Sequence, residues 1–193
     1  MFALERMADR WTVRGGTPYK ESKKDAENYT NDQPGLTTVE WVDASYHIRW
    51  LEPLNGNEKA LGLDILFNDK RKQALKHAKE STLPTVTPPL DLVQGYKGYL
   101  AYFPVYRDTE FDGFIVGVFN LGEVLKGAMP ARYKNDFYLK VYSEDNSLLY
   151  ESDNITTEKN KQFQIEKKIR FYGQGWTLRL MPRNVFVDGH QTF

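Results

Sequence analysis

The sequence predicts an α+β protein in which an N-terminal helical region precedes two small antiparallel sheets. Apolar residues near the N-terminus recur every three or four positions, which is the period of an amphipathic helix. From residue 36 the chain becomes rich in β-branched and aromatic residues, which favour strands. After a short helical stretch that begins at Leu121, further alternating segments predict a second, smaller sheet.

The N-terminal helical region occupies residues 1–33. An apolar stripe runs along its first half and consists of Leu4, Met7, Ala8 and Trp11. The Gly-Gly-Thr-Pro segment at 15–18 interrupts the pattern, and Pro34 stops the polar helical run that follows. Packing against the chain's own sheet and packing against a second copy would both bury the stripe, and the pattern favours neither.

The predicted first sheet consists of strand hairpins that precede and follow one helix in the sequence. Its strands are expected at 36–43, 46–51, 90–93, 98–106 and 113–119, with a short extended segment at 85–87. The helix covers 71–79, and Asn68 or Asp69 can cap it. The charge run at 69–72 is interpreted as a solvated helix face. The second sheet is expected from strands at 136–143, 148–151, 162–172 and 176–181.

Composition and charge argue against several classes of function. The 193 residues include 26 Lys and Arg and 26 Asp and Glu, so no positive excess is available to neutralise phosphates, and we expect no nucleic-acid partner. The sequence has no cysteine, which excludes disulfides, thiolate zinc sites and a cysteine nucleophile. It also has no apolar run of about 20 residues that could span a bilayer.

The sequence shows no motif for catalysis or for metal binding. The histidines His47, His77 and His190 have no carboxylate or second histidine at a metal-ligand spacing. A phosphate-binding glycine loop and the Gly-Xaa-Ser-Xaa-Gly motif are both missing. We therefore expect no cofactor, no metal and no catalytic residue, and predict that this chain is not an enzyme.

Asp64 interrupts an apolar run at 60–67. Burying an ionised carboxylate without a partner is costly, so such a residue caps a helix, pairs with a cation or accepts hydrogen bonds from a ligand. Many aromatic residues lie between 96 and 119. They can fill the core of a curved sheet, or they can form the walls of a cavity that orients a small ligand.

Four segments together resemble a known family. They are QPGLTTVEWV (33–42), LGLD (61–64), PTVTPP with LVQG (84–89 and 92–95), and FPVY with DGFIVGVF (103–106 and 112–119). In this order and spacing they are similar to the CHASE family, an extracellular sensory domain found in front of histidine kinases and nucleotide cyclases. The resemblance covers residues 30–130, and the last third of the chain matches weakly.

The resemblance implies a stalk helix followed by two PAS-like antiparallel-sheet modules. The expected divisions are a stalk region at 1–33, a membrane-distal module at 34–121, a membrane-proximal module at 122–183 and a tail at 184–193 that leads to a transmembrane helix. CHASE domains lie between two membrane helices, which this sequence lacks. We therefore expect a periplasmic domain of an inner-membrane protein that forms a homodimer through its stalk.

The resemblance also implies a binding site in the distal module. In the plant cytokinin receptors of this family, an acidic residue there hydrogen-bonds the ligand, and its position matches Asp64. Neighbouring positions that line the pocket match Val86, Thr87, Phe103, Phe114 and Val118. The strand at 46–51 and the loop at 94–96 depart from the plant pattern, so we expect a small molecule with a donor facing Asp64 rather than cytokinin.

The predicted function is extracytoplasmic ligand sensing for a bacterial signalling receptor, such as a histidine kinase or a diguanylate cyclase or phosphodiesterase. Ligand binding would shift the population between two arrangements of the distal module, and the short helix from Leu121 would carry the change onward. The alternative is an ectodomain that serves for dimerisation and binds no small molecule. An enzyme would need a nucleophile and a base in one cleft, and the sequence offers no such pair.

Overall fold

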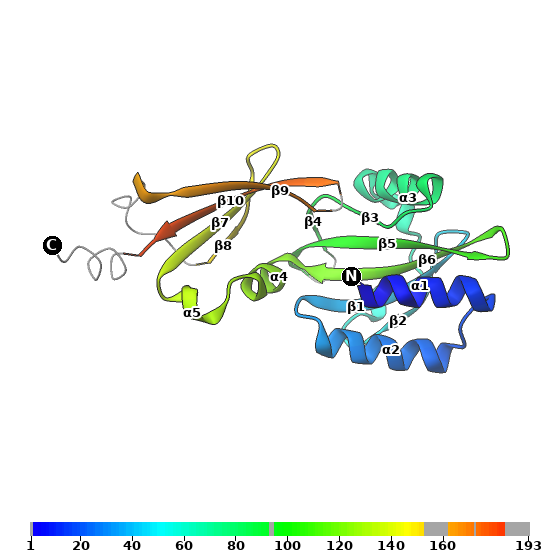
Figure 1. Cartoon of the computed structure of the whole chain (residues 1–193). Helices are drawn as coiled ribbons and strands as arrows, with labels where there is room; N and C mark the ends of the chain where they lie inside the picture. The colour runs from blue at the N-terminus through cyan, green and yellow to red at the C-terminus, as the bar shows by residue number, and fades with distance from the viewer. Residues whose placement is uncertain (1, 93–94, 153–161, 172, 184–193) are drawn as a thin grey trace. The chain divides into compact units, whose positions relative to one another are not determined.

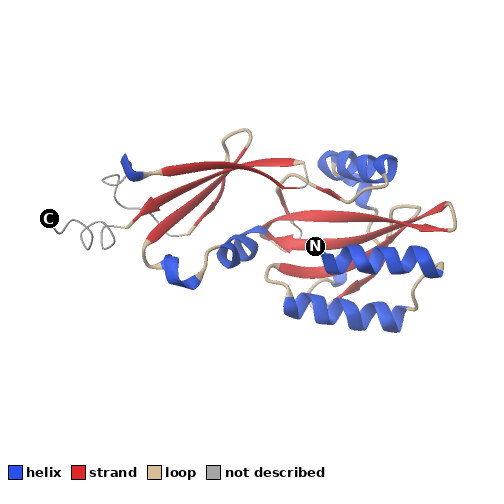
Figure 2. Cartoon of the chain, viewed as in Figure 1, coloured by secondary structure: helices blue, strands red, loops and turns tan. Residues whose placement is uncertain are grey.

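The computed structural model describes residues 2–92, 95–152, 162–171 and 173–183, and they form an α+β protein with N-terminal helices and two antiparallel sheets (Figures 1 and 2). The chain divides into two compact units, Met1–Asn120 and Leu121–Phe193. The predicted fold class is therefore confirmed. The expected tail at 184–193 and His190 lie outside the described residues.

The first unit is built around a sheet with the strand order β2-β1-β6-β5-β3, in which β4 also pairs with β5. All of these pairings are antiparallel. The strands are β1 (Leu36–Asp43), β2 (Ile48–Glu52), β3 (Thr85–Val86), β4 (Leu90–Asp91), β5 (Lys97–Arg107) and β6 (Glu110–Asn120). Both long central strands, β5 and β6, are almost fully buried, because helices cover both faces of the sheet (Figure 2).

Two helices, α1 (Phe2–Arg14) and α2 (Tyr19–Asp32), cover one face of this sheet (Figure 1). The apolar stripe of α1 is buried against the sheet: the Trp11 ring lies 4.9 Å from the ring of Trp41 on β1, and its Nε1 donates to Asp112 at 2.8 Å. Leu4 packs so closely over Gly117 that a Cβ there would overlap it. The sequence left two ways to bury the stripe, the chain's own sheet or a second copy, and in the structure the stripe packs on the chain's own sheet.

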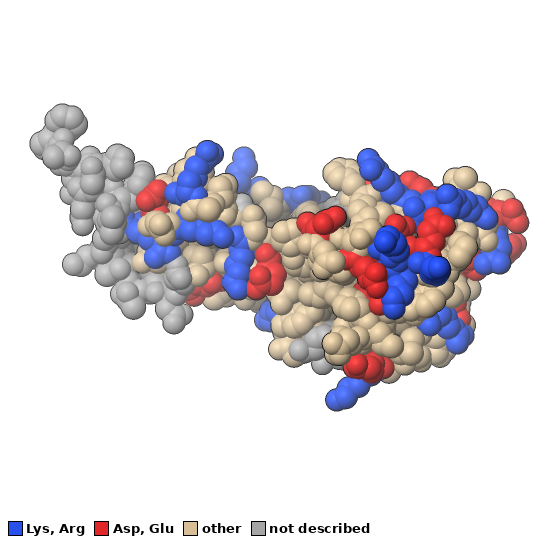
Figure 3. Space-filling model, turned by 90° about the horizontal axis from the view of Figure 1, so that it is seen from below, with Lys and Arg blue, Asp and Glu red and all other residues tan. Residues whose placement is uncertain are grey.

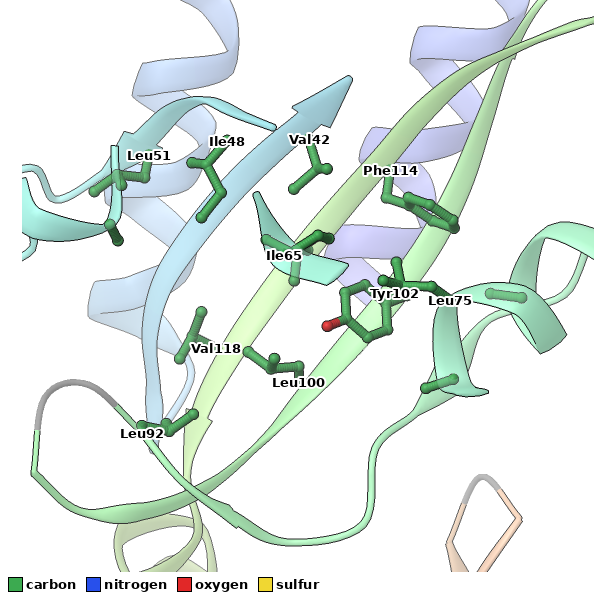
Figure 4. Close-up of a cluster of buried hydrophobic side chains, with 14 of the residues drawn as sticks. Val42, Ile48, Leu51, Ile65, Leu75, Leu92, Leu100, Tyr102, Phe114 and Val118 are labelled. Carbon is green, nitrogen blue, oxygen red and sulfur yellow. The ribbon is translucent and has the colours of Figure 1, made fainter. Parts of the chain in front are cut away.

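The opposite face of the sheet carries α3 (Asp69–Ser81) and the short 3₁₀ helices η1 (Glu58–Ala60) and η2 (Ile65–Phe67). Asn68 caps α3 by accepting hydrogen bonds from the backbone N–H groups of Lys70 and Arg71 at 3.0 and 3.2 Å, as one of the two capping predictions proposed. Leu75 of α3 and Ile65 of η2 are buried in one apolar cluster with residues of the sheet (Figure 4). This cluster is the core between the sheet and α3.

The second unit is a smaller sheet with the order β8-β7-β10-β9, again antiparallel throughout. It consists of α4 (Leu121–Ala128), α5 (Ala131–Lys134), β7 (Phe137–Ser143), β8 (Leu148–Glu151), β9 (Ile165–Phe171) and β10 (Gln174–Pro182). Leu139, Val141, Trp176 and Met181 are buried in it. The alternating pattern of the sequence therefore predicted both the number of strand-rich regions and their antiparallel character.

Candidate functional site

The sheet of the first unit separates the predicted site residues into two groups. Directly opposed residues of an antiparallel pair point to the same face, and successive residues alternate between faces. Phe114 and Val118 lie on the face toward α3 and belong to its apolar cluster. Thr87 joins them because it lies opposite Leu100, whose N–H donates to the Thr87 hydroxyl at 3.0 Å.

Val86 and Phe103 lie on the other face, beneath α1. Val86 is paired with Ala101, and Phe103 is paired with Ile115. Each of these residues lies next in sequence to a residue that faces α3, so its own side chain points to the opposite face. Both side chains are about 1% exposed, so they contribute to the helix-covered core. Phe103 and Phe114 therefore cannot line one pocket, because the sheet lies between their side chains.

Asp64 is exposed, contrary to the expectation that the apolar run at 60–67 buries it. Its carboxylate caps η2 by accepting from the N–H of Leu66 at 2.8 Å, which is the capping interpretation of this residue. The apolar neighbours do not enclose it, since the Leu61 and Phe67 side chains are 47% and 61% exposed. The role of Asp64 toward a ligand stays a prediction from the resemblance.

A different set of polar residues lies on the α3 face of the sheet. The strand register aligns Glu40 of β1 with Val116, Val116 with Tyr102 of β5, and Tyr102 with Thr85. Because directly paired residues share a face, Glu40 and Tyr102 point to the same side as Phe114 and Val118. Tyr102 belongs to the apolar cluster, and Figure 4 shows its hydroxyl directed toward the middle of that cluster.

Arg71 of α3 is a third buried polar residue on this side of the sheet. It lies in the first turn of α3, and its exposed fraction is only 7%, compared with 6% for Glu40 and 1% for Tyr102. The guanidinium lies over the Phe67 ring, with 4.9 Å from Cζ to the ring centroid. The charge run at 69–72 is therefore not wholly a solvated face, because its third residue points into the core.

Electrostatic effects of burial are strong at these residues. Burial raises the pKa of the Glu40 carboxyl from 4.5 to about 7, and the positive charge of Arg71 opposes that rise. Burial also raises the pKa of the Tyr102 hydroxyl, so that this group stays protonated and can donate a hydrogen bond. A cation, an acid poised near neutrality and a hydroxyl thus share one apolar environment.

Several of these polar atoms have no hydrogen-bond partner within the described part of the protein. They are the Tyr102 hydroxyl, Arg71 Nε and the hydroxyl of Thr38, which lies two residues before Glu40 on the same face. Leaving a buried donor or acceptor unsatisfied costs about 1–3 kcal/mol. Such a group of unpaired donors beside a buried acid is suited to hold a small polar molecule.

The described residues contain no group of three or more His, Cys, Asp or Glu side chains that could hold a metal ion. None of the helices in the described part of the chain combines the length and the apolar character needed to cross a membrane.

Comparison with known families identifies the fold. A model of the CHASE domain matches residues 10–150, which is most of the chain. The chain belongs to the CHASE family. It is accordingly a sensory domain, as the resemblance of its sequence predicted. No curated protein sequence matches the chain.

Solved structures share the fold of this CHASE domain at low sequence identity. An extracellular ligand-binding receptor from Desulfohalobium retbaense aligns with a TM-score of 0.70 and 16% identity, over 93% of this chain and 36% of the receptor. The ligand-binding domain of the Pseudomonas aeruginosa amino acid chemoreceptor PctC, solved with GABA, has a TM-score of 0.63 and 13% identity, over 95% of this chain and 89% of that domain.

The sensor domain of the V. cholerae histidine kinase DctB also matches, with a TM-score of 0.57 and 10% identity, over 85% of this chain and 78% of that domain. The CHASE domain therefore shares its architecture with sensor domains of both chemoreceptors and histidine kinases. It spans about a third of the length of the Desulfohalobium receptor.

Proposed function

We propose that this CHASE domain binds a small polar molecule on the α3 face of its first sheet, through Glu40, Arg71 and Tyr102. The proposal rests on the burial of these three groups around one apolar cluster. In addition, the Tyr102 hydroxyl and Arg71 Nε have no hydrogen-bond partner within the described protein. A ligand that supplies the missing partners would recover the free energy lost in burying them.

The two charges define the chemistry of the ligand. Arg71 and the Tyr102 hydroxyl are donors, so they suit an anionic or acceptor group such as a carboxylate. Glu40 is an acceptor when ionised and suits an ammonium or another donor. A molecule that carries a carboxylate and an amine satisfies both. The fold-sharing domain of PctC was solved with GABA, and that of the Pseudomonas fluorescens chemoreceptor CtaA, which aligns with a TM-score of 0.62 and 14% identity, was solved with L-alanine.

Binding at this site would require a rearrangement, which supports a sensing role. Ile65 of η2 and Leu75 of α3 are packed in the same cluster as Tyr102, so a ligand must move these elements away from the sheet. The ligand would favour the rearranged state by its differential affinity for it. The strand β6, which contributes Val116 to the site, continues directly into α4, the first helix of the second unit.

We further propose that the domain lies in the periplasm of a bacterial inner-membrane receptor with a cytoplasmic output domain such as a histidine kinase or a diguanylate cyclase or phosphodiesterase. A homodimer through the N-terminal helices would use the outer side of α1, since its inner stripe is buried. Exposed positions recur there at helical spacing and include Phe2, Arg6, Asp9 and Val13. Phe2 and Val13 are 77% and 85% exposed, so a second copy could bury them at this side of α1.

The test is ligand-induced thermal stabilisation of the 193-residue chain by GABA, L-alanine and related amino acids. Tyr102→Phe removes only the unpaired hydroxyl, so we expect a stability equal to or above wild type and a loss of the ligand-induced shift. Tyr99→Phe removes a hydroxyl from a residue on the opposite face and should retain the shift.

Asp64→Asn separates this site from the one that the family resemblance implies. The proposal predicts that Asp64→Asn keeps the ligand-induced shift, because Asp64 is exposed and caps η2. Loss of the shift in Asp64→Asn together with its retention in Tyr102→Phe would overturn the proposal.

A further inference from the structure

The second unit contains a cavity that the sensing site of the first unit does not involve. Its volume is about 610 Å³, which is within the usual range for small-molecule sites of about 300–1,000 Å³. The walls come from α4, α5, β7, β8 and the residue after β10, so all of them belong to one compact unit. The described walls of the cavity therefore lie within the second unit.

Positive charge dominates the walls. Lys126 of α4, Lys134 of α5 and Arg183 line the cavity, and no Asp or Glu is among its described lining residues. Lys and Arg side chains also gather on the part of the second unit seen in Figure 3. Neutral and apolar groups, including Asn135, Leu139 and Tyr150, complete the walls. The composition differs from that of the whole chain, where positive and negative residues are balanced.

The three cations differ in how much of their charge is already compensated. Lys126 forms an exposed ion pair with Glu123 at 2.7 Å on the same helix. Lys134 has no ion-pair partner within the described residues. The Arg183 guanidinium lies over the Tyr138 ring at 4.1 Å, and the Arg183 backbone N–H donates to the carbonyl of Asp136 at 2.7 Å. The ring contact therefore positions the guanidinium, and the hydrogen bond holds the backbone of Arg183.

We propose that this cavity is a second ligand site that binds a phosphate group borne by a small organic molecule. A phosphate monoester carries a charge of about −1.5 to −2 at pH 7, which matches two to three neighbouring cations better than a single carboxylate does. A planar guanidinium binds phosphate through two parallel hydrogen bonds, and a lysine ammonium binds it as a point charge. Leu139 and Tyr150 offer an apolar surface for the organic part.

The phosphate could belong to a soluble molecule or to a lipid headgroup, and both present anionic phosphate oxygens to Lys134 and Arg183, although a phosphodiester headgroup carries one negative charge and a soluble monoester about −1.5 to −2. The experiment therefore has two arms, both with the 193-residue chain. The first arm is calorimetric titration with glycerol 3-phosphate. The second is co-sedimentation with vesicles of phosphatidylglycerol, with phosphatidylcholine vesicles as the neutral control.

The diagnostic variant is Lys134→Gln, because this side chain is exposed on a short helix and its loss does not disturb the core. We expect a decrease in affinity of at least about fivefold, as for the loss of one charge-assisted hydrogen bond. Lys167→Gln is the matched control, since Lys167 is an exposed lysine on β9 of the same unit and does not line the cavity. It should leave the affinity unchanged.

Saturable binding in the first arm alone identifies a soluble phosphate, and binding to phosphatidylglycerol but not phosphatidylcholine identifies a headgroup. Either result supports the site if Lys134→Gln weakens binding and Lys167→Gln does not. Absence of binding in both arms would overturn the proposal. An equal loss in the two variants would also overturn it, because it would show only attraction to the general charge of the surface.

Discussion

At the scale of single residues, Glu40 is a buried acid on the sheet of the first unit. It is 6% exposed on a strand face that is otherwise built from apolar and hydroxyl side chains. Its pKa is raised to about 7, so at neutral pH the folded protein holds this carboxyl close to its protonation midpoint. A group of this kind couples ligand binding and protonation, because a cationic ligand group favours its ionised form.

This residue predicts a specific dependence of stability on pH. The folded-state pKa lies above the unfolded value of 4.5, so the folded state binds more protons in between, and stability falls as pH rises through about 7. Between pH 5 and pH 8, Glu40 should remove roughly 2 kcal/mol from the free energy of unfolding. Urea denaturation at the two pH values measures it.

Glu40→Gln should abolish this part of the pH dependence and make the protein more stable than wild type at pH 8. Glu110→Gln changes an exposed acid on the neighbouring strand β6 and should keep the wild-type profile. If wild type and Glu40→Gln lose the same free energy between pH 5 and pH 8, Glu40 is not a buried acid with a raised pKa.

Residue types also explain why the sequence pointed to Asp64 instead of Glu40. Asp64 interrupts an apolar run, but that run forms a short 3₁₀ helix whose buried side, with Ile65, packs on the core while Asp64 lies on the exposed side. Glu40 alternates with Val39 and Trp41, which is typical of a strand with one solvated face, and the sequence of β1 does not reveal that a helix covers that face. Tertiary packing, which depends on residues distant in the sequence, decides the burial of Glu40.

The burial of Arg71 could have been predicted from the sequence, although Arg71 lies in a run of charged residues. Ala74, Leu75 and Ala78 follow it at three, four and seven positions, so Arg71 lies on the same face of α3 as the buried residues. Helical spacing therefore could have separated Arg71 from the exposed Lys70 and Lys72. Its partner Tyr102 could not be singled out, because β5 has several tyrosines and only the register assigns them to faces.

At the scale of elements, β1 and β6 hold the site in place through a close backbone approach. Gly113 of β6 is paired with Asp43 and has a φ of +126°, and a Cβ there would overlap the carbonyl oxygen of Val42. The backbone of β1 cannot yield as a flexible side chain could. The glycine therefore permits the pairing that aligns Glu40 with Val116.

Gly113→Ala is expected to lower the free energy of unfolding by roughly 3 kcal/mol, from backbone strain and overpacking together. Gly62→Ala is the matched control, because Gly62 has a φ of +79° but nothing lies within 4 Å of its Cβ position. It should cost only about 1 kcal/mol, the strain alone. Equal losses in the two variants would show that the approach of Val42 is unimportant. Chemical denaturation measures both.

The arrangement of elements was largely predictable from the sequence. Alternation located most strands, and Asn68 located the start of α3. The predicted break at 15–18 is confirmed, because Gly15 and Gly16 take positive φ there and divide the N-terminal region into α1 and α2, which both pack on the first sheet. Which face of the sheet each helix covers depends on packing between distant segments, and local patterns do not contain that information.

At the scale of the whole molecule, two compact units join at Asn120 and Leu121, and each has features of a binding module. The first unit has the buried Glu40, Arg71 and Tyr102, and the second has a cationic cavity. A sensory domain with two sites could integrate two chemical signals, since each ligand biases the population of states by its own differential affinity.

The most direct measurement is a crystal structure of the chain with the amino acid that gives the largest thermal shift. We expect ligand atoms within hydrogen-bond distance of the Tyr102 hydroxyl and the Arg71 guanidinium, an amine facing Glu40, and η2 and α3 displaced from the sheet. A ligand bound elsewhere, with Tyr102 and Arg71 still enclosed by Ile65 and Leu75, would contradict it.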